Sequence, residues 1–179
     1  MGATYLADLL ESILAAALAA LDPARTGIPA PALSGITHGL PVIDACEMNG
    51  RLAAYLDPAL AIEPRYLQSR VGGDLPSGRC AVTSFAHISV ELWRCVPTPD
   101  DFGNPPLVTD EAAAAYALAT SAWCLYTGLL QAALAGSLMP GGQCDTVVLA
   151  PLEVLEPQGG AGGIKLPLTI QLSDGGPPP

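Results

Sequence analysis

Positive charge is the scarcest feature of this 179-residue chain. Lysine and arginine together number seven, against 17 aspartates and glutamates, and the formal net charge is −10. Charged residues make up 13% of the sequence, about half the share in ordinary soluble domains. The shortage of basic residues excludes a surface that grips nucleic acid through its phosphates. So small a charged surface also indicates a protein that is largely covered by partners.

Catalytic and metal-binding motifs are missing as well. The five cysteines include no C-x-x-C pair, so neither a zinc site nor a disulfide framework is indicated, and buried free thiols are expected. His38, His87 and the acidic residues show no metal or triad spacing, and no G-x-S-x-G element occurs. We therefore expect no catalytic residue, no metal and no cofactor, and a protein that is not an enzyme.

One glycine-rich run resembles a phosphate-binding loop only superficially. Residues 157–163 lack the Gly-Lys-Ser/Thr ending of a P-loop, and they lie between two expected strands instead of at a strand-to-helix turn. We interpret the run as the flexible tip of a hairpin.

The N-terminus lacks the basic segment and apolar core of a secretion signal. Asp8 and Glu11 interrupt the first expected helix, so we expect the protein to mature in the cytoplasm. The length of 179 residues suits one domain with a sizeable core. We assign this domain to residues 1–172 and expect residues 173–179 to form a flexible C-terminal tail.

What the chain has in excess is one long apolar segment. Residues 109–139 are predicted to form a helix whose first turn is capped by Thr109. Asp110 and Glu111 place negative charge at its N-terminus, where the helix dipole is positive. No further charged residue occurs in the segment, and Gly136 is the first of the residues expected to end the helix.

This helix has two apolar faces. The first holds Tyr116, Thr120, Trp123, Thr127, Leu130 and Leu134, and the second holds Leu118, Leu125, Leu129 and Ala132. Because both faces need cover, we expect one on the protein's own sheet and the other on lipid, another helix or another subunit. The run is rich in alanine, threonine and serine and has no lysine or arginine at its ends, which disfavours a membrane. We expect the face with Leu118, Leu125 and Leu129 to pack between subunits.

Residues 80–95 form the clearest strand. Val82, Ile88, Val90 and Leu92 fall on one face, and Thr83, Phe85, His87, Ser89, Glu91 and Trp93 fall on the other. The second face is half polar, which predicts that it meets water or a polar interface. Phe85 and Trp93 on this face, with Trp123 in the long helix, are candidate anchors for a subunit or partner. Partial cover by a neighbouring loop is the alternative for the strand residues.

The remaining elements complete an α+β domain. We predict an amphipathic helix over residues 4–21, loops over 23–41 and 70–79, and two strands over 146–155 and 164–172. Residues 51–56 fit a short strand or a helical turn, and we favour the strand. Pro151 and Pro167 each remove a backbone donor, which favours edges or bulges that a neighbouring subunit can pair with. The fold class is α+β, a mainly antiparallel β-sheet flanked by an N-terminal helix and a long central helix.

Two segments carry a family resemblance. Residues 91–106 read ELWRCVPTPDDFGNPP and precede the alanine-rich helix, and residues 151–172 read PLEVLEPQGGAGGIKLPLTIQL. The first resembles the middle, and the second the closing hairpin, of small neck proteins encoded by long-tailed phages of actinobacteria. These proteins are tail terminators or head–tail connectors. Residues 56–78 depart from the family pattern.

The resemblance implies a tail terminator of the virion, assembled in the host cytoplasm. Such a protein forms a homo-hexameric ring at the head-proximal end of the tail tube, where it ends tube growth and joins the tail to the head connector. Its partners are further copies of itself, the major tail tube protein and the head-completion (stopper) protein. An acidic lumen suits this role, because carboxylates let DNA pass without specific binding.

Three other functions remain open from the sequence. A head-completion stopper or adaptor of the neck is the nearest, because it shares the same structural demands. A small-molecule-binding or enzymatic domain belongs to a different class, and ligand binding would raise its melting temperature. A membrane-inserted protein is the third, and preparation without detergent would exclude it.

Overall fold

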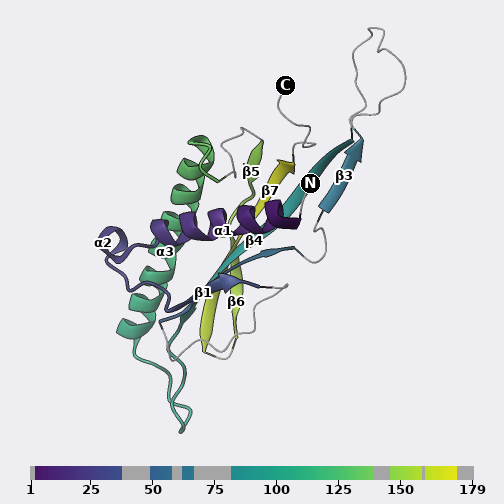
Figure 1. The fold of residues 1–179 in the computed structure, drawn as a ribbon. Coiled ribbons are helices and arrows are strands. Elements are labelled where there is room, and N and C mark those ends of the chain that lie inside the picture. The colour runs from purple at the N-terminus through teal and green to yellow at the C-terminus, as the bar shows by residue number, and fades with distance from the viewer. Residues whose placement is uncertain are drawn as a thin grey trace, which may run out of the picture.

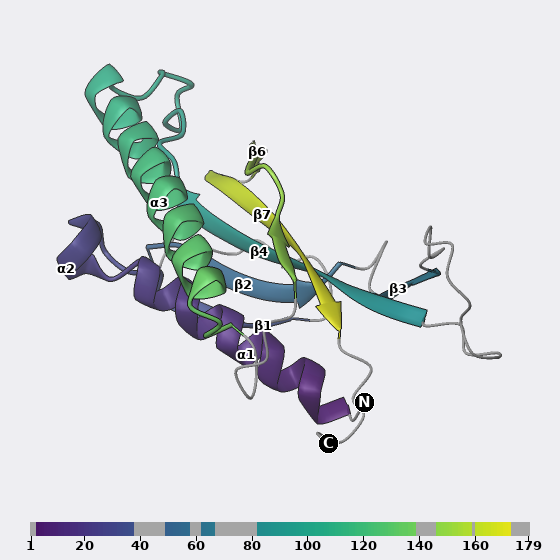
Figure 2. The same ribbon diagram turned by 90° about the horizontal axis from the view of Figure 1, so that it is seen from above.

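The computed structural model describes residues 3–37, 49–57, 62–66, 82–138, 146–158 and 160–172. Within these ranges a seven-stranded, mainly antiparallel sheet carries two long helices across one of its faces (Figure 1, Figure 2). The expected α+β fold is confirmed. The interpretations of His38, of the loop over 70–79 and of the tail over 173–179 concern residues outside the described ranges.

The two long helices lie close to the predicted positions, but the predicted N-terminal cap of the second is wrong. Helix α1 spans Ala3–Ala20 and α3 spans Val108–Leu134. The N-cap of α3 is Leu107, which makes no side-chain hydrogen bond, so Thr109 lies inside the first turn. Asp110 and Glu111 lie in that turn as expected. After the C-cap, Gly136 adopts a left-handed φ of 69°, which ends the helix.

Three strands form the centre of the sheet, and shorter strands complete it. The central strands are β2 (Arg51–Leu56), β4 (Val82–Cys95) and β7 (Ala161–Leu172). The others are β1 (Leu33–Ile36), β3 (Ile62–Tyr66), β5 (Val147–Leu149) and β6 (Glu153–Gln158). The order is β1-β2-β4-β7-β5, with β3 also paired to β4 and β6 also paired to β7. Only the β1–β2 pair is parallel among these.

Three predicted segments differ from the structure. The expected loop over 23–41 contains the short helix α2 (Pro23–Thr26) and β1. The single strand expected over 146–155 is divided into β5 and β6 on either side of Pro151. Most of the glycine-rich run is strand, because β6 continues to Gln158 and β7 begins at Ala161.

Pro167 lies inside the sheet, not at its edge. Ser89 of β4 is opposite it on one side. On the other side its carbonyl accepts a hydrogen bond from the Ala150 N–H at 2.9 Å, so its ring nitrogen also points toward the break between β5 and β6. Proline has no backbone N–H to donate, and at Pro167 the missing hydrogen bond would point to the break between β5 and β6, where Pro151 already interrupts the ladder.

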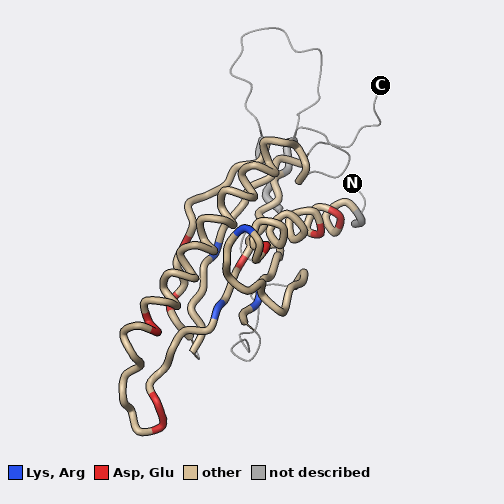
Figure 3. The backbone as a smooth tube through the Cα atoms, turned by 90° about the vertical axis from the view of Figure 1, so that its left-hand side faces the viewer, with Lys and Arg blue, Asp and Glu red and all other residues tan. Residues whose placement is uncertain are grey.

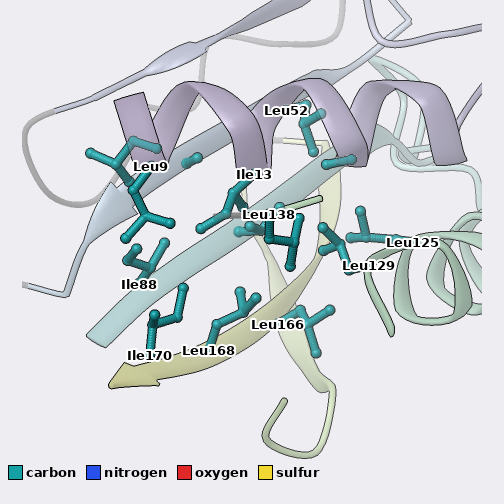
Figure 4. Packing of buried hydrophobic residues seen from close by; sticks show 14 of the residues in the cluster. Leu9, Ile13, Leu52, Ile88, Leu125, Leu129, Leu138, Leu166, Leu168 and Ile170 are labelled. Carbon is teal, nitrogen blue, oxygen red and sulfur yellow. The ribbon is translucent and has the colours of Figure 1, made fainter. Parts of the chain in front are cut away.

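The core fills the space between the sheet and the two helices (Figure 4). Alternate residues of β4 and β7 point into it from the sheet, and leucines and Ile13 meet them from the helices. Its members include Leu9, Ile13, Ile88, Leu92, Leu125, Leu129, Leu166, Leu168 and Ile170. Gly128 allows α3 to cross α1 closely, since a Cβ there would lie 2.3 Å from the Ala20 Cβ.

Candidate subunit interface on the long helix

The surface of α3 that faces away from the sheet is apolar and exposed. Four large side chains on it are spaced by seven, seven and four residues, which places them on one side of a helix with 3.6 residues per turn. They are Tyr116 (71% exposed), Trp123 (69%), Leu130 (36%) and Leu134 (80%), and we call them the outer face of α3. An exposed apolar row of this length is typical of a surface that binds another protein.

The opposite face of α3 belongs to the core of the same subunit. Leu125 and Leu129 are fully buried there, and Leu118 is half-buried against the same cluster. The expectation that these three leucines pack between subunits is therefore wrong for Leu125 and Leu129, which have no surface to offer. Of the two apolar faces seen in the sequence, the one with Trp123 is the one left free.

A buried arginine fixes α3 to the rest of the domain. The Arg94 side chain donates from Nε to the Ser121 Oγ at 3.0 Å, and from Nη1 to the carbonyls of Pro29 at 2.9 Å and Asn49 at 3.2 Å. Burial lowers the pKa of this guanidinium. Because Ser121 lies in the middle of α3, these bonds set which side of the helix faces the sheet.

On the face of the sheet turned away from the helices, buried side chains surround Glu91. Tyr55 Oη donates a hydrogen bond to one carboxylate oxygen of Glu91, and Trp93 Nε1 donates to the other at 3.1 Å. All three side chains are buried, as is Ser89. Burial, together with the bond to Glu91, raises the pKa of Tyr55. The prediction was that this half-polar face meets water or a polar interface. Contact with water is wrong for these residues, which are buried within the subunit and hydrogen-bond to one another.

The two aromatic anchors predicted on β4 differ in their surroundings. Trp93 is 5% exposed, so it has little surface to offer a partner. Phe85 is half-buried. Of the three predicted aromatic anchors, Trp123 is the one that lies open on the surface.

An ion pair extends the polar network along the sheet. Lys165 Nζ lies 3.3 Å from Asp57 Oδ2, and Ser89 Oγ lies 3.5 Å from the same oxygen. Farther along, Thr169 Oγ1 lies 3.2 Å from His87 Nδ1. These contacts join the end of β2 to β4 and β7 across their polar face.

No group of three or more histidine, cysteine, aspartate or glutamate side chains able to hold a metal ion occurs within the described ranges. Cys95 and Cys124 are half-buried reduced thiols. A groove with a volume of about 290 Å³ lies between the first half of α3 and the β6–β7 hairpin. Its walls are apolar except at Glu111, so it lacks the converging polar groups that orient a small-molecule ligand.

By length and composition alone, α3 is long and apolar enough to cross a membrane, and 17% of its most apolar window is buried. Its contacts argue against insertion. A bilayer position would withdraw Leu125 and Leu129 from the core and Ser121 from the Arg94 guanidinium. Buried charge left without its partner is strongly destabilising.

Sequence comparison adds no relative. A scan against protein-family models finds no family that matches the chain, and a search of curated proteins finds no match either.

Proposed function

We propose that this protein is a structural component of a phage virion, a tail terminator that forms a ring at the head-proximal end of the tail tube. The observation that carries the proposal is the outer face of α3, an apolar surface on a rigid helix with Trp123 at its centre. The resemblance of residues 91–106 and 151–172 to phage neck proteins supplies the biological setting.

The physical case for self-association rests on buried area. An aromatic side chain buries about 150–250 Å² when it is covered, and apolar area contributes about 25 cal/mol per Å² removed from water. Tyr116 and Trp123 alone expose most of their surface in the isolated subunit. Covering both in a ring therefore gives a favourable contribution of several kcal/mol per subunit, before the cost of association.

The charge of the chain fits the same role. A net charge of −10 repels the phosphates of DNA at short range. A ring with an acidic passage would let DNA move through it without binding. The partners in this proposal are further copies of the chain, the major tail tube protein and the head-completion protein.

A stopper or adaptor of the neck would use the same apolar surface, so imaging of assembled particles must distinguish it from a terminator. The experiment is to block production of this protein during infection and to examine the lysate by negative-stain electron microscopy. A terminator predicts DNA-filled heads beside unjoined tails of excessive, variable length. Tails of normal length beside emptied heads would assign the stopper, and intact virions would contradict both neck roles.

A further inference from the structure

The loop between β4 and α3 projects beyond the end of the helix and carries acidic residues at its tip (Figure 1, Figure 3). Phe102 lies in this loop with 91% of its surface exposed, between Asp101 and Gly103. A phenyl ring this exposed buries little apolar surface within its own subunit. Its position suits insertion into another molecule.

The loop is held in one conformation before any partner binds. Asp100 Oδ1 accepts hydrogen bonds from the backbone N–H groups of Phe102 at 2.9 Å and Asn104 at 2.8 Å, and Asp100 Oδ2 accepts from Asn104 Nδ2 at 2.8 Å. Gly103 has a φ of 78°, which closes the turn. A preformed loop loses less conformational entropy on binding than a mobile one.

A pocket of suitable size lies where α1, α2 and α3 meet. Its volume is about 170 Å³, and it is lined by Ala20, Arg25, Cys124, Thr127, Gly128 and Gln131. An apolar cavity of about 150 Å³ holds a benzene ring in another protein. The volume of this pocket is therefore enough for one phenyl side chain, and its more polar lining, which includes Arg25, Thr127 and Gln131, also suits the polar residues beside Phe102.

Charge selects this pocket over the larger groove beside the β6–β7 hairpin. The groove carries Glu111, which would face Asp100 and Asp101 of an incoming loop and repel them. The smaller pocket carries the exposed Arg25, which attracts the same carboxylates. A guanidinium beside the phenyl ring adds a favourable cation–π contact.

The loop and the pocket lie on separate parts of one subunit. Thr127 follows Val108 by 19 residues of α3, and at 1.5 Å per residue this is roughly 30 Å along the helix. Thr127 of the pocket lies one helical turn after Trp123, and its Oγ1 donates a hydrogen bond to the Trp123 carbonyl at 2.8 Å. Two different patches that meet between neighbours form a head-to-tail contact, which is the kind that closes into rings.

We propose that Phe102 of one subunit inserts into the Arg25 pocket of the next, with Asp100 and Asp101 facing Arg25. This contact rests on the proposed ring assembly and names the surfaces that make it. Covering the outer face of α3 buries apolar surface but does not fix the orientation of neighbouring subunits. The Phe102 contact fixes that orientation.

Charge reversal tests the contact. Arg25→Asp and Asp101→Arg are supplied singly and together in place of the wild-type protein during infection, and infectious particles are counted. Each single reversal places like charges together at every interface of the ring, and is expected to lower the count on the order of tenfold or more. The double reversal restores an opposite-charge pair between positions 25 and 101 while Asp100 stays unpaired, and is expected to raise the count above that of either single reversal. Both residues are exposed, so all variants should melt at the wild-type temperature.

A second measurement uses a native thiol of the pocket. Phe102→Cys places a thiol on the loop that meets Cys124 of the neighbour, so oxidation of assembled particles should give covalent multimers on a non-reducing gel. Leu107→Cys, exposed at the base of the same loop, is the matched control and should give none. Single reversals without effect, a double reversal that gives no higher count than the single reversals, or equal cross-linking of both variants would each overturn the contact. If the wild-type protein itself leaves tail length and head joining unchanged, the proposed function fails instead.

Discussion

The indole ring of Trp93 occupies the place where a side chain of Gly163 would be. The two residues are paired across β4 and β7, and a Cβ on Gly163 would lie 2.7 Å from the ring. The ring thus lies flat against the neighbouring strand, and its Nε1 reaches the Glu91 carboxylate at 3.1 Å. Gly163 is needed here for space, not for flexibility.

Replacing Gly163 with alanine should therefore destabilise the subunit. The new methyl group has to displace Trp93 from its bond to Glu91, and overpacking of this kind costs about 1–3 kcal/mol. Gly35→Ala in β1 is the matched control, because a Cβ there meets nothing within 4 Å. Urea unfolding followed by tryptophan fluorescence measures both. Equal stabilities of the two variants would contradict the packing of Trp93 on Gly163.

Truncation of two neighbouring residues of α3 should change the free energy of unfolding by very different amounts. Leu125→Ala removes a fully buried side chain and is expected to lower the free energy of unfolding by about 2–5 kcal/mol. Trp123→Ala removes an exposed one and should change it by less than about 0.5 kcal/mol. Chemical denaturation of the purified variants distinguishes the two faces. A larger loss at Trp123 would mean that the helix is rotated relative to the sheet.

The buried hydrogen bonds of Arg94 should depend on its guanidinium and not only on its charge. Lysine carries one ammonium and cannot reach Ser121, Pro29 and Asn49 with the same geometry, so Arg94→Lys is expected to cost about 2–3 kcal/mol. Ser121→Ala leaves Nε without its acceptor, at about 1–3 kcal/mol. Arg25→Ala, at an exposed arginine, is the control and should be nearly neutral. Thermal melting that ranks all three variants alike would refute this role.

The projecting loop should lose its order in acid. The pKa of Asp100 lies below its ordinary value, chiefly because its carboxylate accepts the side-chain hydrogen bond of Asn104, and also because of backbone bonds from Asn104, Phe102 and Gly103. A lowered pKa in the folded state means that these bonds stabilise the turn above the ordinary carboxyl pKa of about 3.9. The stabilisation is lost as the pH falls through the lowered value.

Asn104→Ala should raise the pKa of Asp100 toward its ordinary value, because it removes the largest of these contributions. The side-chain carboxyl carbon of Asp100, followed by NMR during a pH titration, reports the change directly. An unchanged midpoint in the variant would show that the Asn104 side chain does not hold the loop.

The sequence was sufficient to place the main elements. Alternation of apolar residues located β4 and the larger part of β7, and the charge-free run between Asp110–Glu111 and Gly136 located α3 to within a few residues of its ends. These signals are local, since each depends on side chains a few positions apart. Short strands such as β1 and β3 carry too few residues for such a pattern, and β3 contains Pro64.

The sequence could not decide which apolar face of α3 is buried. Neither face carries a charge, and the choice depends on contacts far apart in the chain, namely Arg94 with Ser121 and Ala20 with Gly128. The same holds for Glu91, which looked solvent-exposed by alternation but is satisfied by Tyr55 and Trp93. Phe102 lies in a proline-bounded loop, where no periodic pattern marks an aromatic residue as exposed or buried.

Measuring tail length with the outer face of α3 altered and the fold left intact tests whether this face assembles a tail terminator. Trp123→Asp is supplied in place of the wild-type protein, and Ala15→Asp, on the exposed side of α1, serves as the charge control. Both should melt as the wild type does. We predict overlong tails without heads for Trp123→Asp and joined tails of normal length for Ala15→Asp, counted by electron microscopy. Normal, head-joined tails with Trp123→Asp would contradict the claim that this face assembles a tail terminator.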